Sequence, residues 1–139
     1  TSCQVYINYQ IECSFTFDIE AYINTILSLC KIKKGRFEFT FCNNDKIIEI
    51  NKHYLNRTYA TDIISFNLGT VVDPDADIYI SIEQVTENST NFSHSVEDEI
   101  KTVIIHGILH TLDYKDYTEE EKNIMFKEQE RLFNLATHE

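Results

Sequence analysis

The sequence contains no long apolar segment and no tract of low complexity. A transmembrane helix needs about 20 consecutive apolar residues, and no run in this chain approaches that length. The N-terminus also lacks the basic region followed by an apolar stretch that characterises a secretory signal. We therefore expect a soluble, cytoplasmic protein with no membrane partner. Its 139 residues, 42% of them hydrophobic, predict a single domain over residues 1–139 with a substantial core.

Cysteines are few, and none of them are paired in the sequence. Cys3, Cys13, Cys30 and Cys42 show neither the spacing of a zinc knuckle nor that of a redox motif. The pattern predicts four reduced and mostly buried thiols. Two disulfides would be the alternative in a secreted protein, but the absence of a signal sequence argues against it.

Basic residues are scarce, with 12 against 23 acidic residues and a formal net charge of -11. This balance argues against general affinity for nucleic acid, because contacts to phosphate need Lys and Arg. The charge is unevenly distributed, however. Residues 31–57 contain seven basic and three acidic side chains, whereas residues 73–139 contain five basic and sixteen acidic ones. This asymmetry permits a basic face beside an acidic one; alternatively, residues 31–36 form a solvated loop after a helix.

One segment of the chain points to chemistry. His106 and His110 are four residues apart, and Asp116 follows the second histidine by six residues. Side chains four residues apart lie on one face of a helix. A carboxylate from the turn beyond that helix would supply a third ligand for a metal ion. The pattern therefore predicts a metal-dependent hydrolase.

The helix that carries the two histidines is predicted to follow an N-cap at Ser95 and to end near Leu112, with acidic residues in its first turn. Residues 103–112 are so apolar that this segment should be buried nearly all round. Gly107 inside the helix costs about 1 kcal/mol relative to Ala, which indicates a close neighbour such as a metal-binding floor or a packed strand. The alternative for the histidines is that both are core residues hydrogen-bonded to backbone or carboxylate groups.

A glutamate is missing directly after the first histidine. Zinc peptidases of the His-Glu-x-x-His type use that glutamate as their general base, and the longer form of their pattern supplies a third ligand after a turn. This chain has Gly107 in place of the glutamate. Peptide hydrolysis by that mechanism is therefore not expected.

Three ordered motifs resemble those of the YbeY-type endoribonucleases. The first reads His106-Gly-Ile-Leu-His110-Thr-Leu-Asp-Tyr114-Lys-Asp116 and is similar to the family signature His-Gly-x-Leu-His-Leu-x-Gly-Tyr-Asp-His. Upstream, Asn51-Lys-His-Tyr54 and Thr61-Asp-Ile-Ile-Ser-Phe66 resemble the family elements Asn-x-x-Tyr and Thr-Asp-Val-Leu-Ser-Phe. Asp77-Ile-Tyr-Ile-Ser81 echoes a further element, Gly-Asp-Ile-x-Ile-Ser.

The resemblance implies a metal-dependent endoribonuclease that takes part in ribosomal RNA maturation at the 3′ end of 16S rRNA and in ribosome quality control. It implies a metal site formed by His106, His110 and Asp116, with Zn²⁺ as the expected ion and another divalent metal as the alternative. Ribosomal RNA is the implied partner, together with a ribosomal protein or a ribosome-associated GTPase that would suit the acidic half of the chain.

The resemblance also places residues 61–66 along the cleft. There Asp62 would orient water or a metal-binding histidine, or else it only caps or pairs at the start of a strand. Ser65 would bind phosphate, or else a neighbouring backbone group. Arg57 is the candidate cation for the scissile phosphate, with Lys52 and His53 as weaker candidates. His94 and His138 are expected at the surface without a role.

The departures from the family pattern concern the same regions. Asp116 stands where the family usually has a third histidine, which replaces a neutral nitrogen ligand by an anionic oxygen. Zinc accepts both ligands, and the harder set makes manganese more competitive. Asp113 replaces a glycine in the turn, and Asp tolerates left-handed backbone better than most residues do. Leu55 replaces an arginine, while Arg57 stands where the family often has a lysine.

The remaining patterns predict an α+β domain in which helices cover a small mixed sheet and the metal site lies on a helix and the turn after it. Strands are predicted at residues 5–11, 36–42, 63–66 and 77–81, the last two joined in a hairpin-like connection that contains Gly69 and Pro74. Phe37, Phe39 and Phe41 alternate with polar residues and should point into the core. Helices are predicted after caps at Asp18, Asn44, Ser95 and Thr118, with a short helix from Ile82. The last helix contains Ile124, Phe126, Leu132 and Phe133.

Two other functions remain open on these observations. In the first, the site belongs to a metallohydrolase that acts on an amide or a small ester. Alternatively, the chain is a ribosome-associated binding module whose metal is structural because a fourth protein ligand closes the site.

Overall fold

The computed structural model describes residues 3–54 and 61–137. Within these ranges the elements follow the order β1 (Gln4–Tyr9), α1 (Ile19–Leu29), β2 (Arg36–Cys42), α2 (Asn44–Tyr54), β3 (Ile63–Asn67), β4 (Asp75–Ser81), α3 (Ile82–Asn91), α4 (Val96–Thr111) and α5 (Glu119–Thr137). The expected α+β class and its small mixed sheet are confirmed, since four strands form one sheet in the order β1-β2-β4-β3.

The sheet combines parallel and antiparallel pairs. β1, β2 and β4 run parallel, and β3 pairs with β4 in the antiparallel direction, with Ile63 opposite Ile80 and Asn67 opposite Ala76. The expected hairpin-like connection between the last two strands is therefore confirmed. The first strand ends at Tyr9 rather than at residue 11. Tyr9 lies opposite Phe41, and β2 ends at the next residue, Cys42, so β2 offers almost no further residues for pairing.

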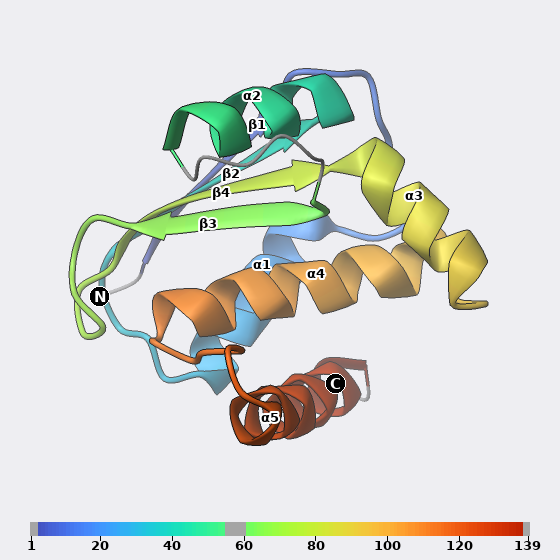
Figure 1. Cartoon of the computed structure of the whole chain (residues 1–139). Helices are drawn as coiled ribbons and strands as arrows, with labels where there is room; N and C mark the ends of the chain where they lie inside the picture. Colours follow the sequence, from blue (N-terminus) through green and yellow to red (C-terminus); the bar gives the residue numbers. More distant parts are fainter. Residues whose placement is uncertain (1–2, 55–60, 138–139) are drawn as a thin grey trace.

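Helices cover both faces of the sheet (Figure 1). α1 and α4 pack on one face, α2 packs on the other, and α5 lies outside α1 and α4. The main core lies between the sheet and the α1/α4 layer, and it includes the fully buried rings of Phe37, Phe39 and Phe41, as their alternation predicts. A smaller apolar cluster beneath α2 contains Cys42, Ile47, Ile50 and Ile64.

Local capping signals set most helix starts as expected. The side chains of Asp18 and Ser95 accept hydrogen bonds from backbone N–H groups in the first turns of α1 and α4. Thr118 and Glu121 form a capping box before α5: Thr118 Oγ1 accepts from Glu121 N at 3.1 Å, and Glu121 Oε1 accepts from Thr118 N at 3.0 Å.

The predicted cap of α2 is wrong by one residue. Asn44 is the first helical residue, and Asn43 Oδ1 accepts the hydrogen bond from Lys46 N at 3.1 Å. Two consecutive asparagines offer equivalent caps, so the choice depends on tertiary contacts. Here Asn44 Oδ1 accepts from Ser81 Oγ at 2.5 Å, and its N–H donates to Glu83 Oε1 at 2.7 Å. Asn44 thereby ties the start of α2 to the start of α3.

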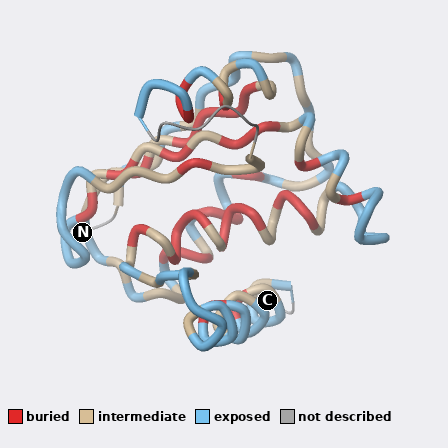
Figure 2. The backbone as a smooth tube through the Cα atoms, viewed as in Figure 1, coloured by how far each residue is buried: buried red, intermediate tan, exposed pale blue. Residues whose placement is uncertain are grey.

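The burial of the chain follows this layering (Figure 2). α4 is buried along most of its length, whereas α5 is largely exposed on its outer side. In α5, Met125 and Leu132 are buried, but Ile124 and Phe126 are 54% and 59% exposed. None of the helices in the described ranges has the length and hydropathy that a bilayer-spanning segment needs.

The cysteines form no disulfide, and all four thiols are free. Only Cys42 is fully buried, however, whereas the other three are partly exposed. The expectation that most are buried is wrong, because Cys3, Cys13 and Cys30 lie at the edge of the main core rather than inside it.

Candidate metal centre

α4 positions the two histidines. His106 and His110 lie one helical turn apart and remain partly exposed, while apolar neighbours such as Ile105, Ile108 and Leu109 are fully buried. The helix thus turns its apolar surface towards the core. Its two imidazoles face the α4–α5 connection and α5, to which they are hydrogen-bonded.

The turn after α4 delivers the carboxylate. Leu112 caps the helix, and Asp113 adopts a left-handed conformation with φ of 72°, as expected where the family has a glycine. The N–H groups of Asp113 and Tyr114 donate to the carbonyl oxygens of His110 and Leu109, which closes the helix end. This reversal returns the chain past the histidines and brings Asp116 Oδ2 to 3.6 Å from His110 Nε2.

Hydrogen bonds to the outer ring nitrogens determine how the imidazoles are presented. His106 Nδ1 lies 3.0 Å from Gln129 Oε1, and His110 Nδ1 lies 3.0 Å from the carbonyl oxygen of Tyr114. The carbonyl oxygen of Tyr114 can only accept, so in this contact Nδ1 of His110 carries the proton and its Nε2 keeps the lone pair. The amide of Gln129 can serve His106 either as acceptor or as donor. Metal-binding histidines are oriented by such contacts to their second nitrogen.

The two Nε2 atoms converge at 2.9 Å. This is a hydrogen-bonding distance, so either a proton or a metal ion can join the two rings. Nitrogen atoms of both rings and a carboxylate oxygen of Asp116 all lie within 4.8 Å of one another. Two nitrogen ligands and one oxygen ligand suit Zn²⁺ and also other divalent transition metals, so the donor set fits a metal ion.

The electrostatic environment favours the neutral imidazole that a metal requires. Burial lowers the pKa of His110 below its ordinary value, and the neighbouring His106 lowers it further. The carbonyl of Tyr114 and the carboxylate of Asp116 act in the opposite direction but do not reverse the shift. His110 therefore remains available as a ligand at a lower pH than an exposed histidine would.

The contact from Gln129 leads to a testable prediction. We expect Gln129→Leu to weaken metal binding about 10- to 100-fold, because it removes the acceptor that orients His106. Competition with a chromophoric chelator measures this change directly. Glu130→Leu places the same side chain at the adjacent exposed position and serves as the matched control. Equal metal affinity of the Gln129 and Glu130 variants would contradict the orienting role.

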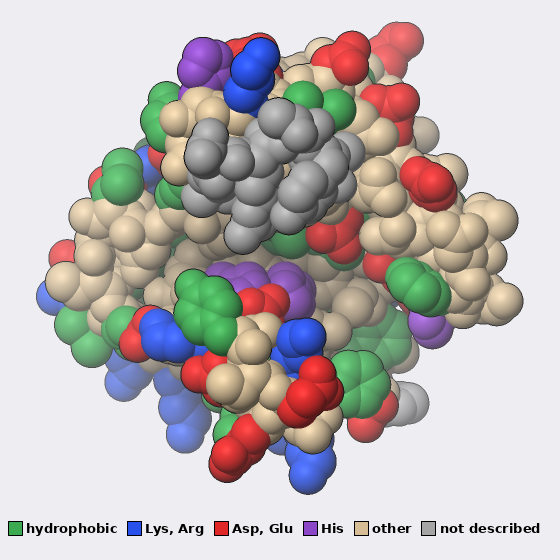
Figure 3. Space-filling model, in the orientation of Figure 1, with side chains coloured by type: hydrophobic (Ala, Val, Ile, Leu, Met, Phe, Trp, Pro, Cys, Tyr) green, Lys and Arg blue, Asp and Glu red, His purple; other side chains and the backbone are tan. Residues whose placement is uncertain are grey.

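The three side chains line an open cleft of about 530 Å³ between β3 and the α4–α5 connection. In Figure 3, purple histidine side chains lie at the floor of the hollow in the centre of the view. Asp62 and Ser65 also line this cleft, so the structure brings both sequence-predicted residues to the histidines. Arg57 and Leu55 lie outside the described residues. Lys115 is the cation among the described lining residues, whereas Lys52 and His53 are exposed elsewhere on α2.

Asp62 occupies a half-buried position at the start of β3. Its Oδ2 accepts a hydrogen bond from Asn88 Nδ2 at 3.4 Å, and burial raises the pKa of its carboxyl group. The proximity of His106 counteracts this rise only in part. Glu99 is a second buried acid nearby, and both burial and the charge of Asp62 raise its pKa. The cleft thus contains a carboxyl group that holds a proton more readily than an exposed aspartate does.

Ser65 contributes to the attachment of β3 to α4. Its hydroxyl donates to the carbonyl oxygen of Gly107 at 3.2 Å, which corresponds to the backbone-binding alternative for this residue. A Cβ atom at Gly107 would lie 2.6 Å from Ile63 Cδ1 and 3.2 Å from Ile78 Cγ2. The close neighbour that Gly107 indicates is therefore a packed strand, and the glycine lets β3 and β4 approach the histidine-bearing turn of α4.

Three contacts at the site were missed by sequence reasoning. Gln129 and Asn88 belong to other helices and orient His106 and Asp62 through tertiary contacts. The third is the carbonyl of Tyr114, a backbone atom that no side-chain pattern reveals. One signal was present: Gln129 lies at helical spacing between the buried Met125 and Leu132, and a polar residue on a buried helix face requires a partner.

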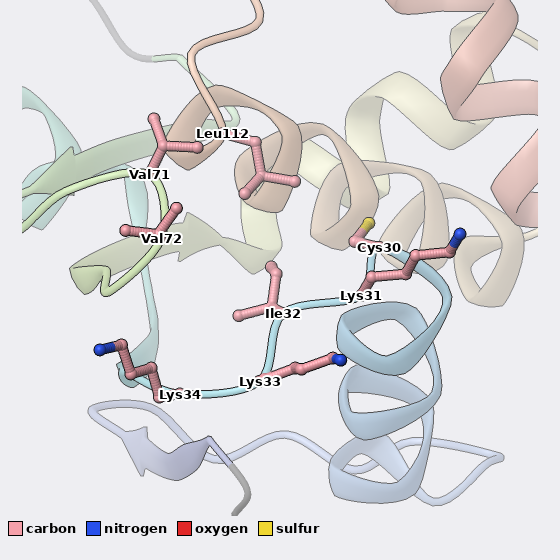
Figure 4. A pocket seen from close by; sticks show the side chains of 8 residues that line it. All are labelled: Cys30, Lys31, Ile32, Lys33, Lys34, Val71, Val72 and Leu112. Carbon is pink, nitrogen blue, oxygen red and sulfur yellow. The ribbon is translucent and has the colours of Figure 1, made fainter.

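The basic segment before β2 borders a separate hollow of about 390 Å³ (Figure 4). Lys31, Lys33 and Lys34 lie around it, but their ammonium groups point in different directions and do not converge on one point. Arg36 forms ion pairs with Glu38, Asp75 and Asp77. The arrangement favours a solvated loop over a phosphate-binding face. His94 is exposed, as expected, and His138 lies outside the described residues.

Fold and site together define a class of protein: a small α+β domain whose open cleft gathers two imidazoles and a carboxylate in the manner of a hydrolase metal centre. Comparison with known families makes the assignment specific. The family model described as endoribonuclease YbeY matches residues 6–137. The chain therefore belongs to the endoribonuclease YbeY family, whose name denotes hydrolases that cut RNA at internal bonds, and the resemblance of its motifs is confirmed.

Individual relatives agree with this assignment. The endoribonuclease YbeY of Karelsulcia muelleri is 39% identical over 128 residues, covering 89% of this chain and 91% of the relative. The endoribonuclease YbeY of Flavobacterium psychrophilum is 39% identical over 132 residues, covering 90% and 91%. The solution structure of TM1509 from Thermotoga maritima matches with a TM-score of 0.67 at 22% identity, covering 96% of this chain and 88% of that one. This last likeness supports the fold.

Proposed function

We propose that this protein is a metal-dependent endoribonuclease that matures ribosomal RNA by hydrolysis of a phosphodiester bond. The observation that carries the proposal is the convergence of two imidazole Nε2 atoms and a carboxylate in an open cleft, in a chain of the endoribonuclease YbeY family. Gly107 follows the first histidine, so the site lacks the general base of the zinc peptidases.

The metal ligands in this proposal are His106, His110 and Asp116, and the ion is Zn²⁺, with Mn²⁺ as the alternative. With three protein ligands, a bound ion would have a position left for water, as in catalytic rather than structural zinc sites. A bound divalent ion supplies two effects, a lower pKa of its water and polarisation of a phosphoryl oxygen. Gln129 and the carbonyl of Tyr114 hold the ligands in place.

Asp62 acts as the proton acceptor in the cleft. Its carboxyl group faces the same space as the histidines, and its raised pKa brings it closer to the neutral range in which a general base is most effective. Asn88 holds the carboxylate through its amide. Ser65 has a positioning role in this scheme, because its hydroxyl is bound to the backbone of α4.

The substrate and its surroundings follow from the family and the charge distribution. Lys115 contacts the phosphate from the α4–α5 connection in exchange for its ion pair with Asp113, whose Oδ1 lies 2.8 Å from its Nζ, and Arg57 contributes a second cation. The substrate is the 3′ end of 16S rRNA, so the protein acts in the cytoplasm. The acidic half of the chain, residues 73–139, provides a docking surface for a basic ribosomal protein or a ribosome-associated GTPase.

A cleavage assay with a synthetic RNA tests the reaction. Protein stripped with a chelator should be inactive, and addition of Zn²⁺ or Mn²⁺ should restore endonucleolytic cleavage. Because water rather than the 2′-hydroxyl attacks, a single 2′-deoxy nucleotide at the cut site should leave cleavage within a fewfold. Cleavage that survives in His110→Ala, or that stops with the 2′-deoxy substrate, would contradict the proposal. Activity on esters or amides alone would favour a different metallohydrolase.

A further inference from the structure

The candidate metal centre lies at the junction of two hollows. One is the cleft described above, and the other is a hollow of about 410 Å³ against α5. His106 and Asp116 line both of them. The second hollow is completed by side chains of α5, which are Lys122, Asn123, Met125, Phe126 and Gln129. A phosphodiester held at the metal centre would therefore have space for one nucleoside on each side.

An exposed aromatic ring is present at each of these hollows. Phe126 lines the hollow against α5 and is 59% exposed, although the adjacent Met125 is buried in the core. Tyr117 lines the cleft and is 83% exposed. Neither ring contributes to the main core. Exposed aromatic side chains beside a polar site offer flat apolar surfaces for a ligand that stacks.

We propose that the α5 hollow is a nucleobase subsite in which Phe126 stacks on the base next to the scissile phosphate. Tyr117 receives the base on the other side of that phosphate in the cleft. This inference rests on the proposed function and adds the determinants that position the substrate. Asn123 offers an amide to the edge of the base from the same helix turn.

The charges around the hollow favour a base over a second phosphate. Asp116 contributes a carboxylate, and Lys122, the only cation among the described residues that line this hollow, has its Nζ 3.7 Å from Glu119 Oε1. A phosphate would gain little in this environment, whereas a neutral base with a π-face is not repelled. Stacking on aromatic side chains also lets an acidic protein bind RNA without a large set of phosphate contacts.

Binding to a short fluorescent single-stranded RNA tests the subsite without cleavage, because the metal is removed by a chelator. We expect Phe126→Ala to weaken binding about tenfold and Phe126→Trp to preserve it, in line with base stacking on an aromatic ring. Phe92→Ala is the matched control, since Phe92 is 62% exposed at the end of α3 and lines neither hollow. Equal affinities of Phe126→Ala and Phe92→Ala would overturn the inference.

A chemical cycle gives the sharper test with the metal-loaded protein. RNAs that lack a single base are compared at each position around the bond that the wild-type protein cuts. At one position next to the cut bond, removal of the base should lower the kcat/KM of the wild-type protein about tenfold. In Phe126→Ala, which already lacks the stacking ring, removal of the same base should cause no further loss of kcat/KM. Independent, multiplying losses at every position would overturn the subsite. Absence of metal-dependent cleavage by the wild-type protein would instead overturn the proposed function, and the binding comparison would still decide the subsite.

Discussion

Asp116→Ala is expected to lower RNA cleavage by about 1000-fold and to abolish tight metal binding. The carboxylate is one of three ligands, and the several kcal/mol of transition-state stabilisation that a metal provides depend on a complete site. In contrast, Asp116→His restores the ligand that the family usually has at this position. We expect it to retain metal binding and to keep cleavage within about tenfold of the wild-type rate.

Metal content and single-turnover cleavage should be measured on the same preparations, together with the unfolding midpoint. Glu120→Gln is the control, because it removes an exposed carboxylate four residues away that lines neither hollow. If Asp116→Ala binds metal and cleaves RNA like Glu120→Gln, Asp116 is not a ligand. Loss of both activity and folding in Asp116→Ala would indicate a structural ion.

Gly107→Val is expected to destabilise the protein by about 3 kcal/mol, at the upper end of the range for overpacked cores. A Cβ at this position already lies 2.6 Å from Ile63 Cδ1 and 3.2 Å from Ile78 Cγ2, and valine adds two further methyl groups. Gly107→Ala should lie near neutrality, because the gain of about 1 kcal/mol in helix propensity offsets the displacement of the flexible end of Ile63.

Urea denaturation of the metal-free protein measures these differences. The variant Ile63→Val provides an internal control, since it removes the Cδ1 atom that the new side chain would meet. In that background Gly107→Ala should become stabilising by up to about 1 kcal/mol. Wild-type stability of Gly107→Val, or an unchanged effect of Gly107→Ala in the Ile63→Val background, would contradict the packing explanation.

Features that depend on a few neighbouring residues could be predicted. The capping box of Thr118 and Glu121 and the left-handed turn at Asp113 are set by residues within one helical turn. The alternation of Phe37 to Phe41 indicates one buried face of a strand for the same reason. By comparison, the choice between Asn43 and Asn44 as a cap was not predictable, because it depends on contacts with the distant α3.

The sequence alone determined the α+β class, the helix that carries His106 and His110, and Asp116 as the acid that joins them in a candidate metal site, since helical spacing and turn chemistry are local. Only the tertiary structure decided that the two Nε2 atoms face each other, that Gln129 orients one ring, and that Ser65 binds the backbone of α4. It also decided that Phe126 is exposed beside the site rather than buried. These features depend on how α5 and β3 pack against α4. That packing is determined jointly by residues that lie far apart in the chain.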